Sequence, residues 1–339
     1  MTILMTARRA RLGLLLVGTA CAHRLPNQAV SFDAAGPDNR GRVLADAFFS
    51  NALGAAKHLM VYLPASYDHE PNRRYPVAYY LHGLSGAEAD WIAKGNIDGT
   101  ADSLVARGAP ETIIVMPDGD DGWYTTWNTQ LSFRTCADTL HVEAPDTYCV
   151  EHERYDDYVA HDVVAFIDGH YRTLADRAHR GIGGLSMGGY GAVILALKHP
   201  DVFAAAASHS GVLSTMYVGP HPFVAPPRYA ATVPEIRPAA GSFWPRYLNY
   251  WGTDIGRWRD VDAARAAEEL VRSGRARPAL FIDCGVDDGF VDQNRAFHFE
   301  LTRIGYAHSY AEWPGANTWR YWSTHVAESL AWMTKQIAP

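Results

Sequence analysis

The segment Gly181-Ile-Gly-Gly-Leu-Ser-Met-Gly-Gly-Tyr-Gly191 points most directly to the fold of this chain. It contains the pattern G-x-S-x-G around Ser186, between an expected strand and an expected helix over 187–199. A serine in so tight a strand-to-helix turn needs small neighbours, and its hydroxyl then projects out of the turn. A phosphate-binding loop is the rival interpretation of such a glycine-rich turn, but the G-K-[ST] ending is missing. The pattern therefore predicts that Ser186 is a nucleophile.

Outward from this segment, apolar β-runs alternate with helical stretches. The predicted strands cover 59–63, 77–81, 112–116, 180–183, 204–208, 279–282 and 309–313. The predicted helices lie near 97–107, 157–171, 187–199, 261–273, 289–304 and 319–336. Continuous apolar strands that alternate with helices are typical of a sheet buried on both faces. We therefore predict an α/β fold with a mostly parallel central sheet and helices on both faces.

One catalytic domain is expected over residues 41–339, because no linker divides the chain. The alternation of strands and helices breaks at about 217–250, a segment rich in proline and aromatic residues. A long irregular insertion in a compact domain is usually functional, so we expect a lid or pocket wall there. A surface loop without a role remains the alternative.

The composition excludes several classes of protein. The chain has 339 residues, of which 48% are hydrophobic and 20% charged, so it can bury a large core. Its net charge is −7, and Lys and Arg form no block outside the N-terminus, which argues against a nucleic-acid partner. No apolar run reaches the length of roughly 18 residues that a membrane span needs.

The N-terminus has the features of an export signal. Three arginines between residues 8 and 11 precede a short apolar run, Leu12–Gly18, and small residues follow up to Cys21. We expect a signal peptide over 1–21 and a polar tether over 22–40. Lipid attachment at Cys21 and ordinary cleavage near it both remain open. In either case the protein is expected to be periplasmic, secreted or lipid-anchored at the cell envelope.

Export changes the interpretation of the remaining cysteines. Cys136 and Cys149 bracket a polar loop, and in an oxidising compartment this spacing favours a disulfide between them. Cys284 ends an apolar run and is expected to be a buried thiol. None of the cysteines has the paired spacing of a zinc site.

Two further motifs follow predicted strands. Leu81-His82-Gly83-Leu84-Ser85-Gly86 precedes the G-x-S-x-G segment, where such hydrolases carry a loop that binds the oxyanion. Leu84 and Met187 are the expected backbone donors, and we interpret His82 as a residue that shapes the loop. Asp283-Cys-Gly-Val-Asp-Asp-Gly-Phe290 follows a later strand, in the position expected for a catalytic acid. Only one of the adjacent Asp287 and Asp288 can face the site, and a turn-capping role is the alternative for either.

These motifs together resemble the esterase branch of the α/β-hydrolases, which includes esterase D, S-formylglutathione hydrolases, feruloyl and acetylxylan esterases, and mycolyltransferases. The resemblance runs from roughly residue 55 to 335 and rests on five blocks in order. They are Tyr79-Tyr-Leu-His-Gly-Leu84, Met116-Pro-Asp-Gly119, Gly181–Gly191, Asp283–Asp288 with Asn294-Arg295, and Trp313-Pro-Gly315 with Trp319 and Tyr321-Trp322. The resemblance implies that Ser186 is the nucleophile, Leu84 and Met187 the oxyanion donors, and Asp288 the acid. It also implies that the aromatic insertion shapes the substrate pocket.

The chain departs from this family at the general base. The family reads Pro-Gly-Gly-His-Thr-Trp after its last strand, whereas this chain reads Pro314-Gly-Ala-Asn-Thr-Trp319, with Asn317 in the slot of the histidine. An amide has no titratable nitrogen and cannot take the serine proton. Loss of a triad member costs about four to six powers of ten in turnover. Among the other histidines, His209 is the least implausible substitute base, because it follows a strand near the carboxyl edge of the sheet. His298, His308 and His325 are weaker candidates.

Three functions remain open on these grounds. The first is an exported serine ester hydrolase that acts through Ser186 on aryl or acylated-sugar esters. The second is a catalytically impaired relative that binds such esters, because Asn317 replaces the base. The third is an acyltransferase to a sugar alcohol. No metal or organic cofactor is expected, the partner is a small-molecule or carbohydrate ester, and the oligomeric state is left open.

Overall fold

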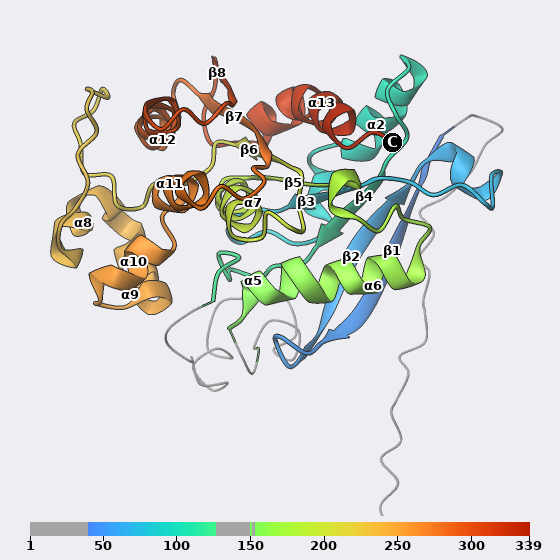
Figure 1. Ribbon diagram of the computed structural model, residues 1–339, viewed down its shortest axis with the longest axis horizontal. Coiled ribbons are helices and arrows are strands. Elements are labelled where there is room, and N and C mark those ends of the chain that lie inside the picture. The colour runs from blue at the N-terminus through green and yellow to red at the C-terminus, as the bar shows by residue number, and fades with distance from the viewer. Residues whose placement is uncertain (1–39, 127–149, 151–152) are drawn as a thin grey trace, which may run out of the picture.

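The sheet has eight strands in the order β1-β2-β4-β3-β5-β6-β7-β8. The computed structural model describes residues 40–126, 150 and 153–339. The strands are β1 (Arg42–Ser50), β2 (Ala55–Leu63), β3 (Val77–Leu81), β4 (Ile113–Pro117), β5 (Arg180–Leu185), β6 (Ala205–His209), β7 (Ala279–Gly285) and β8 (Ser309–Trp313). β2 is antiparallel to β1 and β4, and the remaining pairs are parallel, which confirms the predicted fold class (Figure 1).

Helices cover both faces of this sheet. They are α1 (Asp90–Ala93), α2 (Ile97–Ala106), α5 (Tyr155–Asp157), α6 (Val164–His170), α7 (Met187–Lys198), α8 (Val233–Ala240), α9 (Trp244–Trp251), α10 (Ile255–Asp260), α11 (Ala263–Ser273), α12 (Val291–Arg303) and α13 (Trp319–Gln336). A π-helical segment, Tyr158–Val163, joins α5 to α6. In Figure 1, α2 and α13 lie on one side of the sheet, and α6 and α7 lie on the other.

Alternate strand residues supply two separate cores, because successive side chains of a strand point to opposite faces. In β3, Tyr79 belongs to the core under α7, α11 and α12, whereas Ala78 and Tyr80 belong to the core under α2 and α13. Every residue of α7 from Met187 to Leu197 is buried. This central helix therefore shows no polar stripe. Because it is packed against the sheet, the start of the helix holds the preceding turn at Ser186 in place.

The sequence prediction missed β1 and found the other seven strands. β1 lies at the edge of the sheet, and most of its residues are only half-buried. Its sequence, Arg42-Val-Leu-Ala-Asp-Ala-Phe-Phe-Ser50, has neither a continuous apolar run nor a strict alternation. An edge strand with one partner lacks the burial that makes central strands recognisable.

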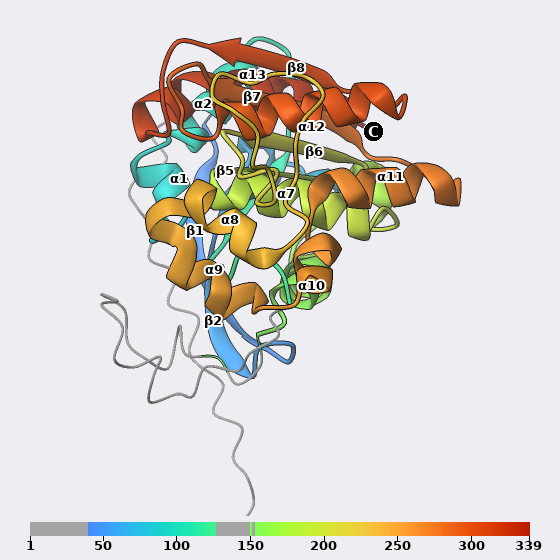
Figure 2. The ribbon, with the colours of Figure 1, turned by 90° about the vertical axis from the view of Figure 1, so that its left-hand side faces the viewer.

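The insertion at about 217–250 contains two short helices, α8 and α9, at one side of the molecule together with α10 (Figure 2). Each of α8 and α9 has a proline in its first turn, Pro234 and Pro245. Proline is favoured there, since the first turn leaves its N–H groups without intrahelical partners. Two of the seven prolines that made this segment look irregular thus begin helices, while Pro238 lies inside α8.

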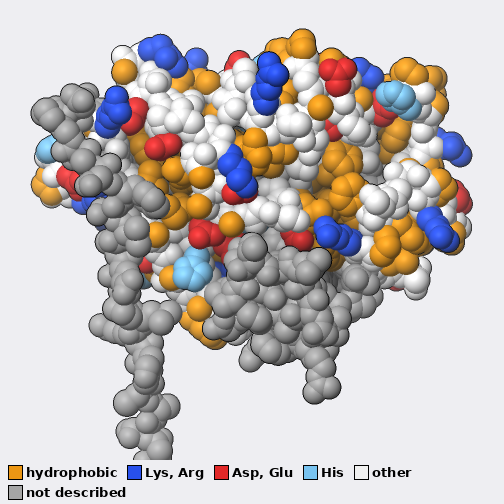
Figure 3. All heavy atoms as spheres, turned by 180° about the vertical axis from the view of Figure 1, so that it is seen from behind, with side chains coloured by type: hydrophobic (Ala, Val, Ile, Leu, Met, Phe, Trp, Pro, Cys, Tyr) orange, Lys and Arg blue, Asp and Glu red, His pale blue; other side chains and the backbone are white. Residues whose placement is uncertain are grey.

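Charged side chains of both signs are scattered over the face seen in Figure 3, among hydrophobic ones. Among the described residues, no helix is long and apolar enough to cross a membrane. The predicted signal peptide, nearly all of the tether, Cys21 and the Cys136–Cys149 pair lie outside the described residues. Cys284 is a buried free thiol at the end of β7, as predicted, and burial raises its pKa.

Candidate active site

Ser186 lies in a strained turn between β5 and α7. Its backbone has φ 51° and ψ −115°, a conformation that a residue with a side chain rarely adopts. The two glycines that lie two residues before and after it, Gly184 and Gly188, have no room for a side chain. A Cβ on Gly184 would lie 2.4 Å from the Gly188 carbonyl oxygen, and a Cβ on Gly188 would lie 2.3 Å from the Leu81 carbonyl oxygen. The G-x-S-x-G pattern is therefore a steric requirement of this turn.

A cavity of about 260 Å³ opens beside the Ser186 turn. Four of the predicted site residues line it together, namely Ser186, Leu84, Met187 and Asn317. Aromatic side chains form much of the remaining wall, from Trp123, Phe243, Tyr247, Phe290, Trp319 and Trp322. Phe243 and Tyr247 come from the insertion, which is therefore part of the pocket wall.

The loop after β3 packs directly on the serine. A Cβ on Gly83 would lie 3.6 Å from the Cβ of Ser186 and 2.7 Å from Cδ1 of Leu185, so a larger residue there would displace the Leu185 side chain. Met187 begins α7, and the first N–H groups of a helix have no intrahelical partner. The positive end of the helix dipole also favours an anion at this point. The surroundings of Ser186 thus suit an oxyanion.

Asp288 faces the base position. It is buried, whereas the adjacent Asp287 is exposed. Its Oδ1 accepts the backbone N–H of Phe290 at 2.8 Å, so it also caps the turn, and its Oδ2 accepts Nδ2 of Asn317 at 3.1 Å. Asn317 Nδ2 lies 3.4 Å from the Ser210 carbonyl oxygen as well. The expected acid, Asp288, and the residue in the expected base position, Asn317, are therefore in contact through an amide.

No described histidine lines the cavity, and the four substitute bases weighed above have other partners. His209 is fully buried, with Nε2 2.7 Å from the Ser329 hydroxyl and Nδ1 2.6 Å from Asp283 Oδ2. His298 and His308 bond to each other at 2.7 Å. His325 stacks on Trp313 with 4.3 Å between ring centroids.

Two charged residues at the cavity, Asp90 and Lys94, were not predicted. Lys94 Nζ lies 2.8 Å from Asp90 Oδ1 and 5.8 Å from the centre of the Trp319 ring. An i,i+4 ion pair is common on helix surfaces, so the sequence carried no signal for this role. Trp123 was missed for a different reason, since it lies on an irregular loop after β4 with φ 54°. Asp90 and Lys94 thus add charged hydrogen-bonding groups to a largely aromatic pocket wall, to which Trp123 also belongs.

Comparison with known proteins identifies similar chains. A family model described as "Putative esterase" matches residues 50–333, which span β2 to β8. An acetyl esterase of Caldicellulosiruptor saccharolyticus is 24% identical over 299 residues, or 85% of this chain and 96% of the relative. An esterase of Mycobacterium tuberculosis is 32% identical over 182 residues, 52% of this chain and only 34% of the relative. A solved ferulic acid esterase is similar with a TM-score of 0.63 and 25% identity, over 89% of this chain and 100% of that one.

Proposed function

We propose that this chain hydrolyses esters through Ser186 with slow turnover. The premise is that it belongs to the esterase family of the α/β-hydrolases, which are carboxylic ester hydrolases. The observation that carries this proposal is the shared cavity of Ser186, Leu84, Met187 and Asn317. The cavity offers a nucleophile and backbone donors to an ester carbonyl. It offers an amide, and no described imidazole, to the serine proton.

The mechanism follows from those groups. The Ser186 oxygen attacks the ester carbonyl carbon, and the N–H groups of Leu84 and Met187 hold the oxyanion that forms. Since Asn317 cannot accept a proton, the serine proton goes to water or hydroxide. Collapse of the tetrahedral intermediate breaks the bond to the alcohol, which leaves with a proton from water. A water molecule then attacks the carbonyl carbon of the acyl-enzyme and gives up a proton to the solvent. The bond to the Ser186 oxygen breaks, the serine takes a proton from water, and the acid is released.

The pocket favours esters with an aromatic acyl group or a sugar alcohol. Trp123, Phe243, Tyr247 and Phe290 offer flat apolar surfaces, while Asp90 and Lys94 offer an acceptor and donors for hydroxyl groups. The name of one similar protein, a ferulic acid esterase, supports an aromatic acyl group, whereas the name of another, an acetyl esterase, supports a small acyl group.

We also propose that the protein is exported, on the basis of the basic and apolar segments before Cys21. Mass spectrometry of protein secreted from a bacterial host tests this. A chain that begins near residue 21 or 22 is expected, with a diacylglycerol mass on Cys21 if it is anchored.

Alkylation before and after reduction should show Cys136 and Cys149 bridged, and two free thiols at these positions would contradict the disulfide.

A second candidate function is ester binding without turnover. The hydrogen bond from Asn317 to Asp288 favours it, because the acid is satisfied without any titratable partner. In that case the cavity would hold an ester or its acid and the chemistry would stop there.

Hydrolysis of p-nitrophenyl acetate by four purified proteins tests these alternatives: the native sequence, Ser186→Ala, Asn317→His, and the double variant. The native protein is expected to exceed Ser186→Ala by a small factor. Asn317→His should raise turnover about 10²- to 10⁴-fold over native, and Ser186→Ala should abolish that gain. A native rate equal to that of Ser186→Ala would overturn hydrolysis and favour ester binding.

A further inference from the structure

The carbonyl oxygen of Gly83 accepts two hydrogen bonds from groups of its own loop. One donor is the Gly86 backbone N–H at 3.0 Å, and the other is Nδ1 of His82 at 2.8 Å. The carbonyl of Gly83 and the N–H of Leu84 belong to one peptide unit, which is trans. In a trans peptide these two groups point in opposite directions. A bond that holds the carbonyl therefore also sets the direction of the Leu84 N–H.

We propose that His82 is a positioning residue that holds the Gly83–Leu84 peptide with its N–H toward Ser186 and so completes the oxyanion site. This inference rests on the proposed function, since it assigns Leu84 the role of oxyanion donor. His82 does not touch the substrate itself, because it is buried beneath the loop and does not line the cavity.

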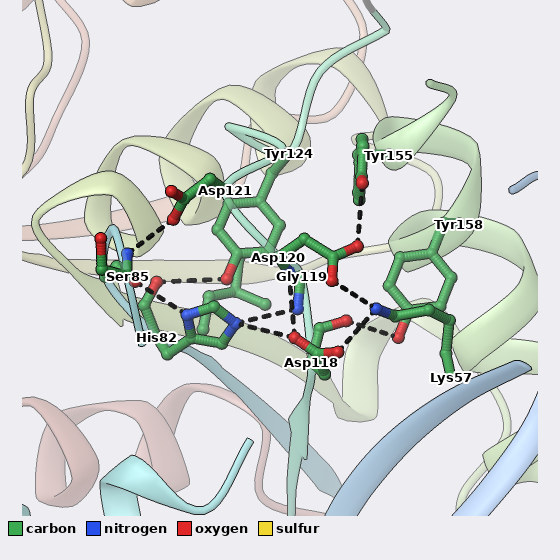
Figure 4. Close-up of polar contacts among 12 residues, drawn as sticks. Lys57, His82, Ser85, Asp118, Gly119, Asp120, Asp121, Tyr124, Tyr155 and Tyr158 are labelled. Atoms are coloured by element: carbon green, nitrogen blue, oxygen red, sulfur yellow. Dashed lines mark hydrogen bonds and ion pairs between the residues drawn. The ribbon is translucent and has the colours of Figure 1, made fainter. Parts of the chain in front are cut away.

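The orientation of the His82 ring is fixed from its other side. The Gly119 N–H donates to His82 Nε2 at 2.9 Å, so Nε2 acts as an acceptor and the ring proton lies on Nδ1 (Figure 4). The Tyr124 hydroxyl donates to the His82 carbonyl oxygen at 3.1 Å. Protonation of the ring would keep the Nδ1 donor. It would also make Nε2 a donor, with Asp118 Oδ1 3.5 Å away as the acceptor.

A buried ion cluster supports the segment that carries Gly119. Lys57 Nζ lies 2.6 Å from Asp118 Oδ2 and 2.7 Å from Asp120 Oδ1, and the lysine side chain is fully buried. The two aspartates flank Gly119, so the cluster fixes the peptide that faces His82 (Figure 4). The next residue, Asp121, accepts the Ser85 N–H at 2.6 Å. The loops after β3 and β4 are thus tied together at both ends of the oxyanion segment.

Two substitutions separate the bond to Gly83 from the bond to Gly119. In His82→Asn, the side-chain NH₂ takes the place of Nδ1 and still donates to the Gly83 oxygen. In His82→Gln, the longer side chain reaches the place of Nε2, and its oxygen accepts the Gly119 N–H, but the donor to Gly83 is lost. Each variant keeps one of the two ring contacts, and Asn, the shorter side chain, leaves the larger cavity, so a greater loss in His82→Gln cannot come from lost packing.

The test is the steady-state hydrolysis of p-nitrophenyl acetate in the native sequence and again with Asn317→His. We expect His82→Gln to lower the Ser186-dependent kcat about 10- to 100-fold with KM nearly unchanged, because the oxyanion exists only in the transition state. His82→Asn should keep most of the native kcat. Equal losses in the two variants, or a loss expressed mainly in KM, would overturn the proposal.

A second measurement does not depend on turnover. Nitrogen-15 NMR of histidine-labelled native protein, with His82→Asn to assign the signal, reports which ring nitrogen carries the proton. A proton on Nδ1 supports the proposal, and a neutral ring protonated on Nε2 overturns it. If the native and Ser186→Ala proteins hydrolyse the ester equally, the proposed function fails, and the NMR result still decides the position of the His82 proton.

Discussion

The side-chain amide of Asn317 donates a hydrogen bond to Asp288, with 3.1 Å between Nδ2 and Oδ2. In serine hydrolases the acid receives such a bond from the histidine, which it orients and whose positive charge it stabilises. The chain therefore keeps the contact between the proposed acid and the proposed base position, where Asn317 offers no proton acceptor that can titrate. Asp288 can hold Asn317 in place, but no positive charge forms there for it to stabilise.

Replacement of Asp288 by asparagine should have very different effects in two backgrounds. In the native sequence the change should cost less than about tenfold in kcat/KM, because there is no imidazolium to stabilise. With Asn317→His, the same change should remove most of the 10²- to 10⁴-fold gain over native, because the imidazolium then lacks its partner. The four kcat/KM values for p-nitrophenyl acetate form a double-mutant cycle. The same loss in both backgrounds would mean that Asp288 acts only through the Phe290 turn that it caps.

The pH dependence of hydrolysis should distinguish the native site from a restored triad. In the native protein, the Ser186-dependent rate should rise with pH without a plateau between about pH 6 and 8, because hydroxide or water takes the proton. Asn317→His should add a sigmoidal step near the usual histidine pKa of about 6.5. Subtraction of the Ser186→Ala rate at each pH is the control. A step near pH 6.5 in the native protein would instead reveal a substitute base.

The sequence predicted the elements that are recognisable from local pattern. Continuous apolar strands and the glycine spacing around Ser186 have simple causes, burial on both faces and backbone contacts shorter than a Cβ allows. Chain order also predicted an acid in Asp283–Phe290, and of the two adjacent candidates Asp288 is the buried one. In each case a few neighbouring residues carry the constraint.

What the sequence missed depends on contacts between distant segments. Trp123 reaches the cavity because its loop packs against the insertion, with 5.2 Å between the ring centroids of Trp123 and Tyr247. Lys57 lies on β2, far along the chain from Asp118 and Asp120, and no local pattern marks it as the partner of both. His209 looked like a candidate base by its strand position, but its side chain points to Ser329 on α13.

Substitution of Gly188 by alanine should destabilise the protein, because the added Cβ would lie 2.3 Å from the Leu81 carbonyl oxygen and 2.5 Å from that of His82. Both are backbone atoms and cannot move without a shift of the loop that carries Leu84. Overpacking of this kind costs about 1–3 kcal/mol. We expect a lower Tm by scanning calorimetry and loss of Ser186-dependent hydrolysis. Gly289→Ala is the control, since its Cβ would meet nothing within 4 Å, and equal Tm values for the two variants would contradict the steric argument.

The last prediction concerns Asp120, whose pKa is raised to about 8 by burial and by the neighbouring charge of Asp118, although Lys57 and Tyr155 oppose the shift. Asp118 takes the charged role beside Lys57, and its own pKa lies below the usual range, since the lysine and His82 more than offset its burial. In the unfolded chain Asp120 should titrate near pH 4. Between about pH 4 and 8 the unfolded state therefore releases a proton that the folded state keeps, so the contribution of Asp120 to stability falls as pH rises.

Asp120→Asn removes this titration and preserves the shape of the side chain. Its amide oxygen can still accept from Lys57, and its NH₂ can donate to the Tyr155 hydroxyl, which now donates to Asp120 Oδ2 at 2.8 Å. The Tm of the variant minus the Tm of the native protein should therefore become more positive from pH 4.5 to 8. Asp201→Asn, at an exposed carboxylate on the surface, should show no such trend. A difference for Asp120→Asn that stays constant with pH, or that becomes more negative, would show that this carboxyl is already ionised in the folded protein.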